Sequence, residues 1–204
     1  LGSFYLDIIK DRLYTSHKTG QARVSALIVM HKLLLSLLSW VSPVLSFTAE
    51  EAFKELKQDI PSIFLSGWHQ DWIDYDFSLD EESWAFLVNL KIDVNKMLED
   101  KRNNGEIGSS LDAEVKIYCN SENFLRLSSC LDELKFLLIV SNVSIEMISD
   151  EEEQAIRIEA EPSKNKKCDR CWHFVDKLVP HLDSNICLRC LENIEGEGEK
   201  RKFF

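Results

Sequence analysis

The stretch Cys168-Asp-Arg-Cys171-Trp-His and its counterpart Cys187-Leu-Arg-Cys190 decide the fold of the C-terminal part of the chain. Each stretch is a Cys-x2-Cys pair, and 15 residues separate the two pairs. This spacing is typical of two zinc knuckles, in which four thiolates complete a closed tetrahedral shell around one structural ion. The pattern therefore predicts one Zn2+ ion held by Cys168, Cys171, Cys187 and Cys190, in a module that spans residues 162–204.

Other readings of these cysteines remain open. Two structural disulfides would fit a secreted protein, but nothing else in the sequence is typical of secretion. A redox Cys-x-x-Cys needs one pair between a strand and a helix. His181 could replace one cysteine as a ligand, and His173 is expected at the surface or beside the ligands. Cys119 and Cys130 stand alone and are expected to be buried thiols, which indicates a reducing, cytoplasmic location.

The sequence offers no catalytic pattern. It contains no Gly-rich phosphate loop and no supported Ser/His/Asp or Cys/His arrangement. Four sulfurs would fill the zinc shell and leave no position for a reactive water. We expect the ion to fold a segment that is too short to bury a core of its own, and so to build a rigid platform.

Basic and aromatic residues surround this platform. Side chains of this kind can stack on unpaired bases while lysines meet phosphates, which favours nucleic-acid binding. The alternative, which the spacing leaves equally open, is that Trp172 packs on the zinc loop and the lysines are merely solvated. The candidate contacts are Arg170, Trp172, Arg189, Lys200, Arg201 and Lys202, with Lys101 and Arg102 further upstream.

The charge of the chain excludes a generic nucleic-acid binder. The formal net charge is −11 over 204 residues. Residues 161–204 carry nine Lys or Arg against eight Asp or Glu, so the acidic excess lies in the rest of the chain. Binding to phosphates needs clustered cations, and it must therefore rest on local patches.

The first half of the chain is predicted to be a helical bundle, residues 1–104. The apolar run 26–47 is long enough to span a membrane, but His31, Lys32 and Pro43 favour a helix buried on most sides. Thr48 and Glu51 have the spacing of a capping box, and residues 58–77 read as a loop. The predicted helices span residues 1–14, 21–42, 49–56 and 81–103.

Residues 105–161 are predicted to form a small α+β unit. Short segments of alternating polarity follow Asn104-Gly105, and they are typical of strands. The predicted strands are 110–119, 135–140, 143–148 and 154–160, with a helix at 121–131. The fold class is therefore mainly α: a helical bundle, a small α+β connecting unit and a zinc knuckle module with four cysteine ligands.

Several motifs together resemble a known family. They are FYLDIIKDRLY at 4–14, PVLSFTAEEAF at 43–53, KRNNGEIGSSLDAEV at 101–115, CDRCWH at 168–173, CLRC at 187–190 and GEGEKRKFF at 196–204. In this order, and over essentially the whole chain, they resemble the C-terminal part of bacterial-type isoleucyl-tRNA synthetases. The knuckle with its Trp and the Glu-Lys-Arg-Lys-Phe tail are the most specific of these motifs.

The resemblance implies that residues 1–104 are the anticodon-binding domain and that the chain grips the anticodon arm of isoleucine tRNA. Such an enzyme joins isoleucine to its tRNA with ATP and Mg2+. The catalytic signatures HIGH and KMSKS are not in this sequence, so the chain alone is not expected to be catalytic. The expected partners are the tRNA and the catalytic body of the enzyme. The chain is expected to be a cytoplasmic monomer that binds neither membranes nor DNA.

Two alternative functions follow from the zinc pattern. One is the zinc-finger tail of a DNA-repair glycosylase, which also carries two Cys-x-x-Cys knuckles. The long helical region upstream and the Lys-Arg-Lys-Phe-Phe end argue against it. The other is a protein-interaction module in which zinc only stiffens a docking surface.

Overall fold

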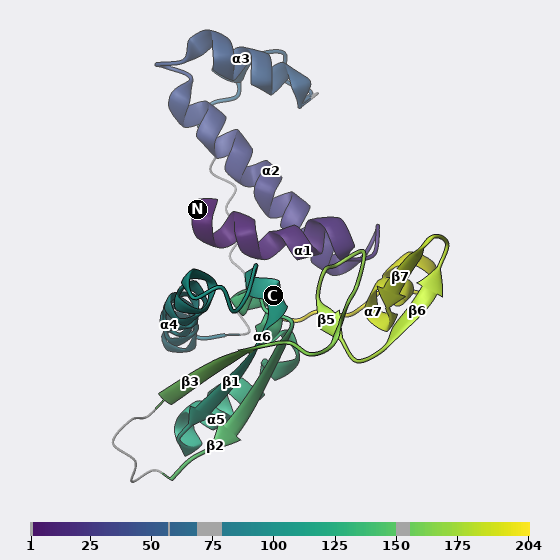
Figure 1. Ribbon diagram of the computed structural model, residues 1–204. Helices are drawn as coiled ribbons and strands as arrows, with labels where there is room; N and C mark the ends of the chain where they lie inside the picture. Colours follow the sequence, from purple (N-terminus) through teal and green to yellow (C-terminus); the bar gives the residue numbers. More distant parts are fainter. Residues whose placement is uncertain (1, 57, 69–78, 150–155) are drawn as a thin grey trace. The chain divides into compact units, whose positions relative to one another are not determined.

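The computed structural model describes residues 2–56, 58–68, 79–149 and 156–204 (Figure 1). The chain divides into two compact units. One consists of residues 1–23 together with 77–204, and the other of residues 24–76. This division differs from the expected boundaries at residues 104 and 161, which stay predictions about domain organisation. Residues 69–78 of the expected loop lie outside the described residues.

The larger unit contains a long helix, α4 (Glu81–Asn103), whose bounds confirm the prediction. Asp80 caps it by accepting a hydrogen bond from the Ser83 backbone N–H at 2.7 Å. Acidic residues lie in its first turn and basic ones in its last turn, which complements the helix dipole. Its inward face buries Leu87, Leu90, Val94 and Leu98.

The same unit begins with a π-helical turn, η1 (Gly2–Leu6), and α1 (Asp7–Thr15). Its sheet has the order β2-β1-β3, with β1 (Ala113–Cys119), β2 (Asn142–Met147) and β3 (Ile156–Pro162). Strand β2 is parallel to β1, and β3 is antiparallel to it. Parallel neighbours need a crossover, which α5 (Ser121–Ser128) and α6 (Leu131–Leu138) supply.

Alternate residues of β1 are buried, as the alternating sequence predicts. Cys119 and Cys130 are 0% and 3% exposed, which confirms that both are buried thiols. Burial raises the pKa of each thiol. The core that these cysteines join extends through α4, α5, α6 and the sheet.

The predicted strand 135–140 is wrong. These residues form the end of α6 and its C-cap, where Ile139 has φ 59°. Leu134, Leu137 and Leu138 are all fully buried, so the segment is apolar on most sides. A short apolar run of this kind has no periodicity that separates a buried strand from a buried helix. The predicted helix 121–131 likewise ends at Ser128, and α6 begins after a break.

The smaller unit holds most of α2 (Gln21–Val41), then α3 (Ser46–Glu55) and a 3-10 turn, η2 (Ile63–Leu65). Its core consists of Leu38, Ala49, Phe53 and Ile63. The Glu50 carboxylate accepts hydrogen bonds from the Ser62 hydroxyl and the Ile63 backbone N–H. Because α3 begins at Ser46, Thr48 lies inside the helix, and the predicted capping box is wrong.

Helix α2 has the predicted length but not the predicted burial. Leu27, Ile28 and Trp40 are 47%, 45% and 57% exposed. Among the described residues, α2 is the one helix long and apolar enough to cross a membrane, by a test that core helices of soluble proteins also pass. The expectation that this helix is buried on most sides is wrong, because large apolar side chains on several of its faces stay exposed.

The cysteine-containing module is built from short elements. The hairpin of β4 (Lys166–Lys167) and β5 (Phe174–Val175) encloses the first Cys pair. The second pair lies where the hairpin of β6 (Leu178–His181) and β7 (Ser184–Cys187) leads into α7 (Leu188–Glu195). Helices dominate the rest of the described chain, so the mainly α class with a small sheet is confirmed.

Candidate metal centre and nucleic-acid interface

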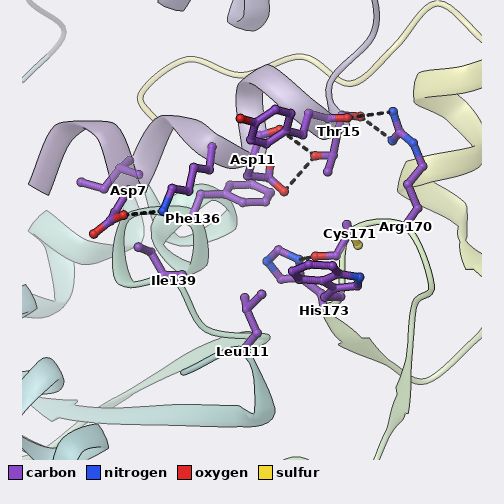
Figure 2. Close-up of a pocket in the computed structure, with 13 residues that line it drawn as sticks. Asp7, Asp11, Thr15, Leu111, Phe136, Ile139, Arg170, Cys171 and His173 are labelled. Atoms are coloured by element: carbon purple, nitrogen blue, oxygen red, sulfur yellow. Dashed lines mark hydrogen bonds and ion pairs between the residues drawn. The ribbon is translucent and has the colours of Figure 1, made fainter. Parts of the chain in front are cut away.

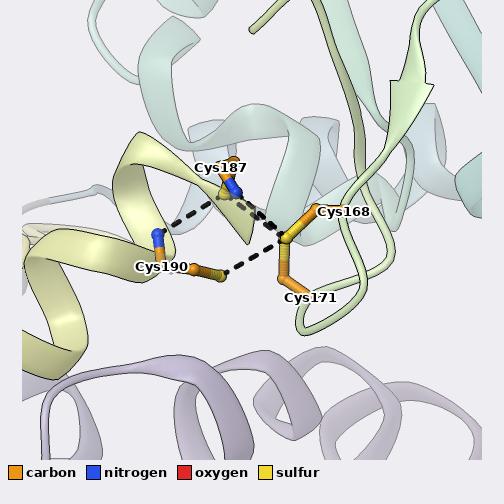
Figure 3. A group of neighbouring side chains, drawn as sticks. All are labelled: Cys168, Cys171, Cys187 and Cys190. Atoms are coloured by element: carbon orange, nitrogen blue, oxygen red, sulfur yellow. Dashed lines mark hydrogen bonds between the residues drawn. The ribbon is translucent and has the colours of Figure 1, made fainter. Parts of the chain in front are cut away.

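The four knuckle cysteines converge on one point (Figure 3). Their Sγ atoms all lie within 4.8 Å of one another, and all four side chains are buried. Cys168 and Cys190 have Sγ atoms 3.8 Å apart, and Cys171 and Cys187 have them 3.7 Å apart. Sulfurs about 2.3 Å from a tetrahedral ion lie about 3.8 Å from each other. A disulfide would need about 2.05 Å, so the disulfide reading is wrong.

The backbone of each knuckle orients its sulfurs. The Cys187 N–H donates to Cys168 Sγ at 3.2 Å, and the Cys190 N–H donates to Cys187 Sγ at 3.4 Å. The second of these bonds favours the thiolate form of Cys187, the form that binds metals. A hydrogen bond from the Cys171 thiol, with those from Cys190, holds the pKa of Cys187 well below its usual value. In the first knuckle the turn closes at Trp172, whose N–H donates to the Cys168 carbonyl and whose φ is 66°.

The two neighbouring histidines lie outside the metal centre. His181 Nε2 is 3.3 Å from a Glu195 carboxylate oxygen. His173 is 6% exposed and packs edge-on against Phe136, and its Nδ1 is 3.2 Å from the carbonyl oxygen of Cys171. Of the two expected positions, the one beside the ligands is confirmed and the one at the surface is wrong. Four buried sulfurs therefore fit a closed, all-sulfur metal site, with no position for a catalytic water.

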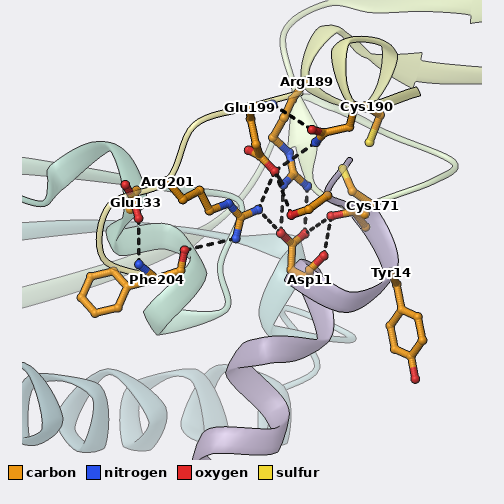
Figure 4. Close-up of polar contacts among 12 residues, drawn as sticks. Asp11, Tyr14, Glu133, Cys171, Arg189, Cys190, Glu199, Arg201 and Phe204 are labelled. Atoms are coloured by element: carbon orange, nitrogen blue, oxygen red, sulfur yellow. Dashed lines mark hydrogen bonds and ion pairs between the residues drawn. The ribbon is translucent and has the colours of Figure 1, made fainter. Parts of the chain in front are cut away.

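Two of the predicted RNA contacts, Arg189 and Arg201, face inward (Figure 4). Arg189 donates to both carboxylate oxygens of Asp11, at 2.8 and 2.9 Å, and to Glu199 at 3.1 Å. Arg201 donates to the same two carboxylates, and its side chain is 1% exposed. The Arg201 guanidinium carbon also lies 3.6 Å from the centre of the Phe136 ring. The four charged side chains form what we call the Asp11 cluster: Asp11, Arg189, Glu199 and Arg201.

In this cluster the two arginines offset the effect of burial on the pKa of each carboxyl group. Burial alone would raise the pKa of Asp11, but the hydrogen bonds and charges of Arg189 and Arg201 hold that pKa well below its usual range. The same two arginines lower the pKa of Glu199 against its own burial. The cluster therefore joins α1, α7 and the C-terminal tail through buried ion pairs.

Arg170 also contacts α1 rather than only solvent. Its guanidinium donates to the backbone carbonyls of Thr15, at 2.6 Å, and Tyr14, at 3.3 Å. These carbonyls lie at the end of α1, where helix C-terminal oxygens lack intrahelical partners. Arg170 thus caps the helix from the first knuckle.

The other predicted contacts remain accessible. Trp172 is 60% exposed, and Lys200 and Lys202 are exposed on the tail. Far from them in sequence, Lys101 forms an ion pair with Glu106 at 2.7 Å, and Arg102 forms one with Glu99. The described structure brings the knuckle and tail residues together but gives Lys101 and Arg102 local partners on and just after α4.

The sequence analysis missed the residues that hold the tail. The Glu133 carboxylate, in the first turn of α6, accepts the backbone N–H groups of Lys202, Phe203 and Phe204 at 2.6–2.9 Å. Phe204 is 4% exposed and stacks near Trp84. No spacing rule connects Glu133 or Asp11 with a tail so far away in the sequence. The only signal was that the tail motif and the FYLDIIKDRLY motif occur in the same chain.

Comparison with known proteins gives one matching family. Residues 1–117 match the family described as the anticodon-binding domain of tRNA ligase. This segment includes α1 to α4 and part of β1.

Curated relatives match the chain from end to end. Among them are proteins named isoleucine–tRNA ligase from Nitrosomonas europaea, 44% identical over 211 residues, and from Saccharophagus degradans, 37% identical. Each covers 100% of this chain. A third, from Thiobacillus denitrificans, is 42% identical and covers 99% of it. The chain spans only 21–23% of the length of these relatives.

Proposed function

Because the chain belongs to the family defined by the anticodon-binding domain of tRNA ligases, we propose that it is the tRNA-binding part of an isoleucine–tRNA ligase. The observation that carries the proposal is the match to proteins of that name along the whole chain, at 37–44% identity. The match includes the segment with the four cysteines as well as residues 1–117. The expected ligand is the anticodon arm of isoleucine tRNA.

The metal in this proposal is one structural Zn2+ ion bound by Cys168, Cys171, Cys187 and Cys190. Supporting it are the four buried sulfurs, with separations of 3.7 and 3.8 Å in two of the pairs. The ion would supply cross-linking of the module and no reaction chemistry. The cysteines themselves fix the two knuckles, and the knuckles carry Trp172 and Arg170 next to α1.

The RNA contacts in the proposal are the accessible members of the predicted set. Trp172 offers an exposed ring for stacking on a base, and Lys200 and Lys202 offer charges for phosphates. Lys101 and Arg102 would form a second contact region. Arg189 and Arg201 are not carried into this set, because their guanidinium groups are bound in the Asp11 cluster.

The activity of a whole isoleucine–tRNA ligase needs more than this chain contains. Such an enzyme would use ATP and Mg2+ in a catalytic body, and that body is the second proposed partner. We propose that the chain serves the body in the cytoplasm by holding the tRNA, as a monomer and without binding DNA.

The proposal is tested by fluorescence anisotropy with labelled RNA hairpins. The full chain, loaded with Zn2+, should bind a hairpin with the anticodon loop of isoleucine tRNA more tightly than one with the loop of another tRNA. The logarithm of the affinity should fall linearly with the logarithm of the salt concentration. Equal affinity for both hairpins at moderate salt would contradict the proposal.

A double variant tests the tail. Lys200→Ala with Lys202→Ala removes two exposed charges and keeps the backbone bonds to Glu133. The salt slope should then fall by about 1.4, since each of the two phosphate contacts contributes roughly 0.7 on single-stranded RNA. Lys96→Ala is the matched control, because this lysine is 73% exposed on α4 and lies outside the proposed contacts. Equal slopes for the two variants would remove the tail lysines from the interface.

A further inference from the structure

The chain passes between its two units at residues 23–24 and again at residues 76–77. A short turn, residues 16–20, precedes the first of these passages and connects α1 to α2. We call this turn the joint. It is closed by the Gly20 N–H, which donates to the His17 carbonyl at 3.0 Å. The conformational freedom of the joint therefore limits how freely the two units can turn at this passage.

The first knuckle holds the start of the joint (Figure 2). The Arg170 guanidinium donates to the Thr15 carbonyl at 2.6 Å and to the Tyr14 carbonyl at 3.3 Å. The backbone of Ser16 is already extended, at φ −68° and ψ 163°, so α1 ends without a glycine turn that would satisfy its last carbonyls. Because Arg170 lies between the two cysteines of the first knuckle, the fold of that knuckle sets the position of this cap.

A cavity of about 570 Å³ lies beside this contact, between α1, the end of α6 and the first knuckle. Tyr14, Phe136 and Trp172 are among the residues that line it. A cavity removes the dispersion contacts that close packing would give to the atoms around it. At this point the end of α1 and the first knuckle lack such contacts, so the two hydrogen bonds of Arg170 supply the attachment.

The tail contacts the joint independently of Arg170. An added Cβ at Gly198 would collide with the His17 side chain, so the tail backbone lies directly against the joint. Gly198 also has φ 87°, a conformation that favours glycine. The next residue, Glu199, accepts a hydrogen bond from the Ser16 hydroxyl at 3.4 Å. Glycine at position 198 thus permits both the backbone conformation and the close approach.

Helix α7 fixes these two residues of the tail. The buried Asn193 side chain accepts the Glu199 backbone N–H at 2.9 Å and donates to a Glu199 carboxylate oxygen at 3.0 Å. Asn193 lies three residues after Cys190, a cysteine of the second knuckle, on the same short helix. The first knuckle therefore reaches the joint through Arg170, and the second knuckle reaches it through Asn193 and the tail.

The knuckles have little structure of their own with which to maintain these contacts. Strands β4 and β5 have two residues each, and β6 and β7 have four residues each. Segments this short bury little apolar surface, so an ion that cross-links the four cysteines supplies much of their stability. Loss of that ion would release both contacts with the joint at once.

We propose that the metal module is a clamp on the joint. Metal bound by the four cysteines fixes Arg170 and the tail, and these restrict the motion of the smaller unit relative to the larger one. Arg170 and Gly198 are positioning residues in this clamp, and they act on the chain rather than on RNA. The inference goes beyond the proposed function, because the clamp is measured without RNA.

The test uses NMR on the full chain loaded with Zn2+. Arg170→Met removes the cap but keeps the four cysteines. Exchange of the Gly20 amide should become about ten- to 100-fold faster, because the charged donor that holds the start of the joint is lost. Residual dipolar couplings in α2 and α3 should shrink relative to those in α4 and β1, because the smaller unit then moves more freely. Arg157→Met is the matched control, since this arginine is 52% exposed on β3 and pairs with Glu159, and it should change neither measurement.

Gly198→Ala perturbs the same joint from the tail. Its added Cβ collides with His17, so this variant should also speed exchange of the Gly20 amide and shrink the couplings in α2 and α3. Gly105→Ala is the matched control, because Gly105 has a similar φ of 72° but nothing within 4 Å of an added Cβ. Since position 198 lies outside both knuckles, Gly198→Ala decides the matter if Arg170→Met binds the metal less tightly.

Removal of the ion by a chelator completes the test. Chelation of the unaltered chain should produce the same changes in exchange and in couplings as the two substitutions. In a chain that carries both Arg170→Met and Gly198→Ala, chelation should change exchange of the Gly20 amide less than about twofold, because the metal acts on the joint through these two contacts. Native mass spectrometry before chelation measures the ion content of each variant.

Unchanged exchange of the Gly20 amide and unchanged couplings after chelation, or in both variants, would refute the clamp. Weaker hairpin binding by Arg170→Met at unchanged exchange would also refute it, because Arg170 would then contact RNA directly. Neither of these results touches anticodon-arm binding by the unaltered chain, which anisotropy measures separately.

Discussion

Replacing Asp11 by Asn tests whether the Asp11 cluster holds the larger unit together. The Asp11 carboxylate accepts two hydrogen bonds from Arg189, at 2.8 and 2.9 Å, and one from Arg201. Asn keeps the shape but removes the negative charge. Glu199 would then be the only carboxylate left in the cluster to balance two buried guanidinium groups.

The expected loss of stability follows from the burial of these charged groups. The side chains of Asp11, Arg189 and Arg201 are 15%, 16% and 1% exposed, so solvent screens the pairs weakly. Removing one partner of a buried ion pair costs about 3–5 kcal/mol, since the remaining charge stays buried. Domains are stable by only about 5–15 kcal/mol, so Asp11→Asn should remove a large share of the stability of this unit.

The assay must report on the larger unit alone, because two units need not unfold together. Amide hydrogen exchange in β1 does this, since its protection in the buried core reports unfolding of that unit. Asp93→Asn is the matched control. It removes an exposed pair with Lys96, at 3.2 Å with side chains 61% and 73% exposed, and should cost less than about 1 kcal/mol.

The pH dependence gives a second readout of the same variant. The pKa of Asp11 is held well below its usual range by the two arginines, so the unfolded chain binds the proton more readily. The stabilisation is then fully present above the unfolded pKa of about 3.9 and is lost as the pH falls towards the folded value. Asp11→Asn should flatten the acid limb of the stability curve.

A loss below about 1 kcal/mol for Asp11→Asn, equal to that of Asp93→Asn, would refute this reasoning. It would mean that Arg189 and Arg201 gain little from Asp11. Arg201→Met separates the two roles. A structural role predicts lost protection in β1, whereas a direct RNA contact predicts weaker hairpin binding with unchanged protection.

Two further predictions concern the metal centre and a buried lysine. Cys190→Ser should reduce the bound metal below one ion per chain, measured by native mass spectrometry. It should also remove amide protection in β6, β7 and α7, measured by hydrogen exchange. Unchanged protection would show that the ion does not fold the module. Lys91 is 3% exposed, and burial lowers its pKa to about 8 from 10.5. Because the unfolded chain holds this proton more tightly, stability should rise by roughly 3 kcal/mol between pH 8 and 10.5. Lys91→Met should abolish that rise in urea unfolding monitored by exchange of β1, and an equal rise in both proteins would contradict the assignment.

Local chemistry in the sequence was enough to predict several features. The Cys-x2-Cys spacing identified all four cysteines that converge, because a knuckle turn is a local structure. The bounds of α4 were predictable because its cap, its apolar period and the charges at its ends all agree. Features of this kind depend on residues within a few turns of one another.

Features that depend on distant partners were not predictable in the same way. Arg189 and Arg201 were predicted to contact RNA because the sequence gives the charge of an arginine but does not identify the residue that it pairs with. The partner, Asp11, lies 178 residues before Arg189. The prediction of a strand at 135–140 was wrong for a related reason. The helix there is buried on most sides, so it lacks the polar positions that would reveal a helical period.

The tail shows how one short motif can serve both structure and binding. Its backbone curls around Glu133, which accepts the three consecutive N–H groups of Lys202, Phe203 and Phe204. Arg201 turns into the Asp11 cluster while Lys200 and Lys202 stay exposed. Arg170 and the Asp11 cluster together hold the first knuckle and α7 against α1. The position of the exposed Trp172 ring thus depends on internal contacts of side chains that are 16% exposed or less. Substitutions in the Asp11 cluster should weaken hairpin binding in proportion to the protection lost in α1, whereas substitutions of Lys200 should weaken binding alone.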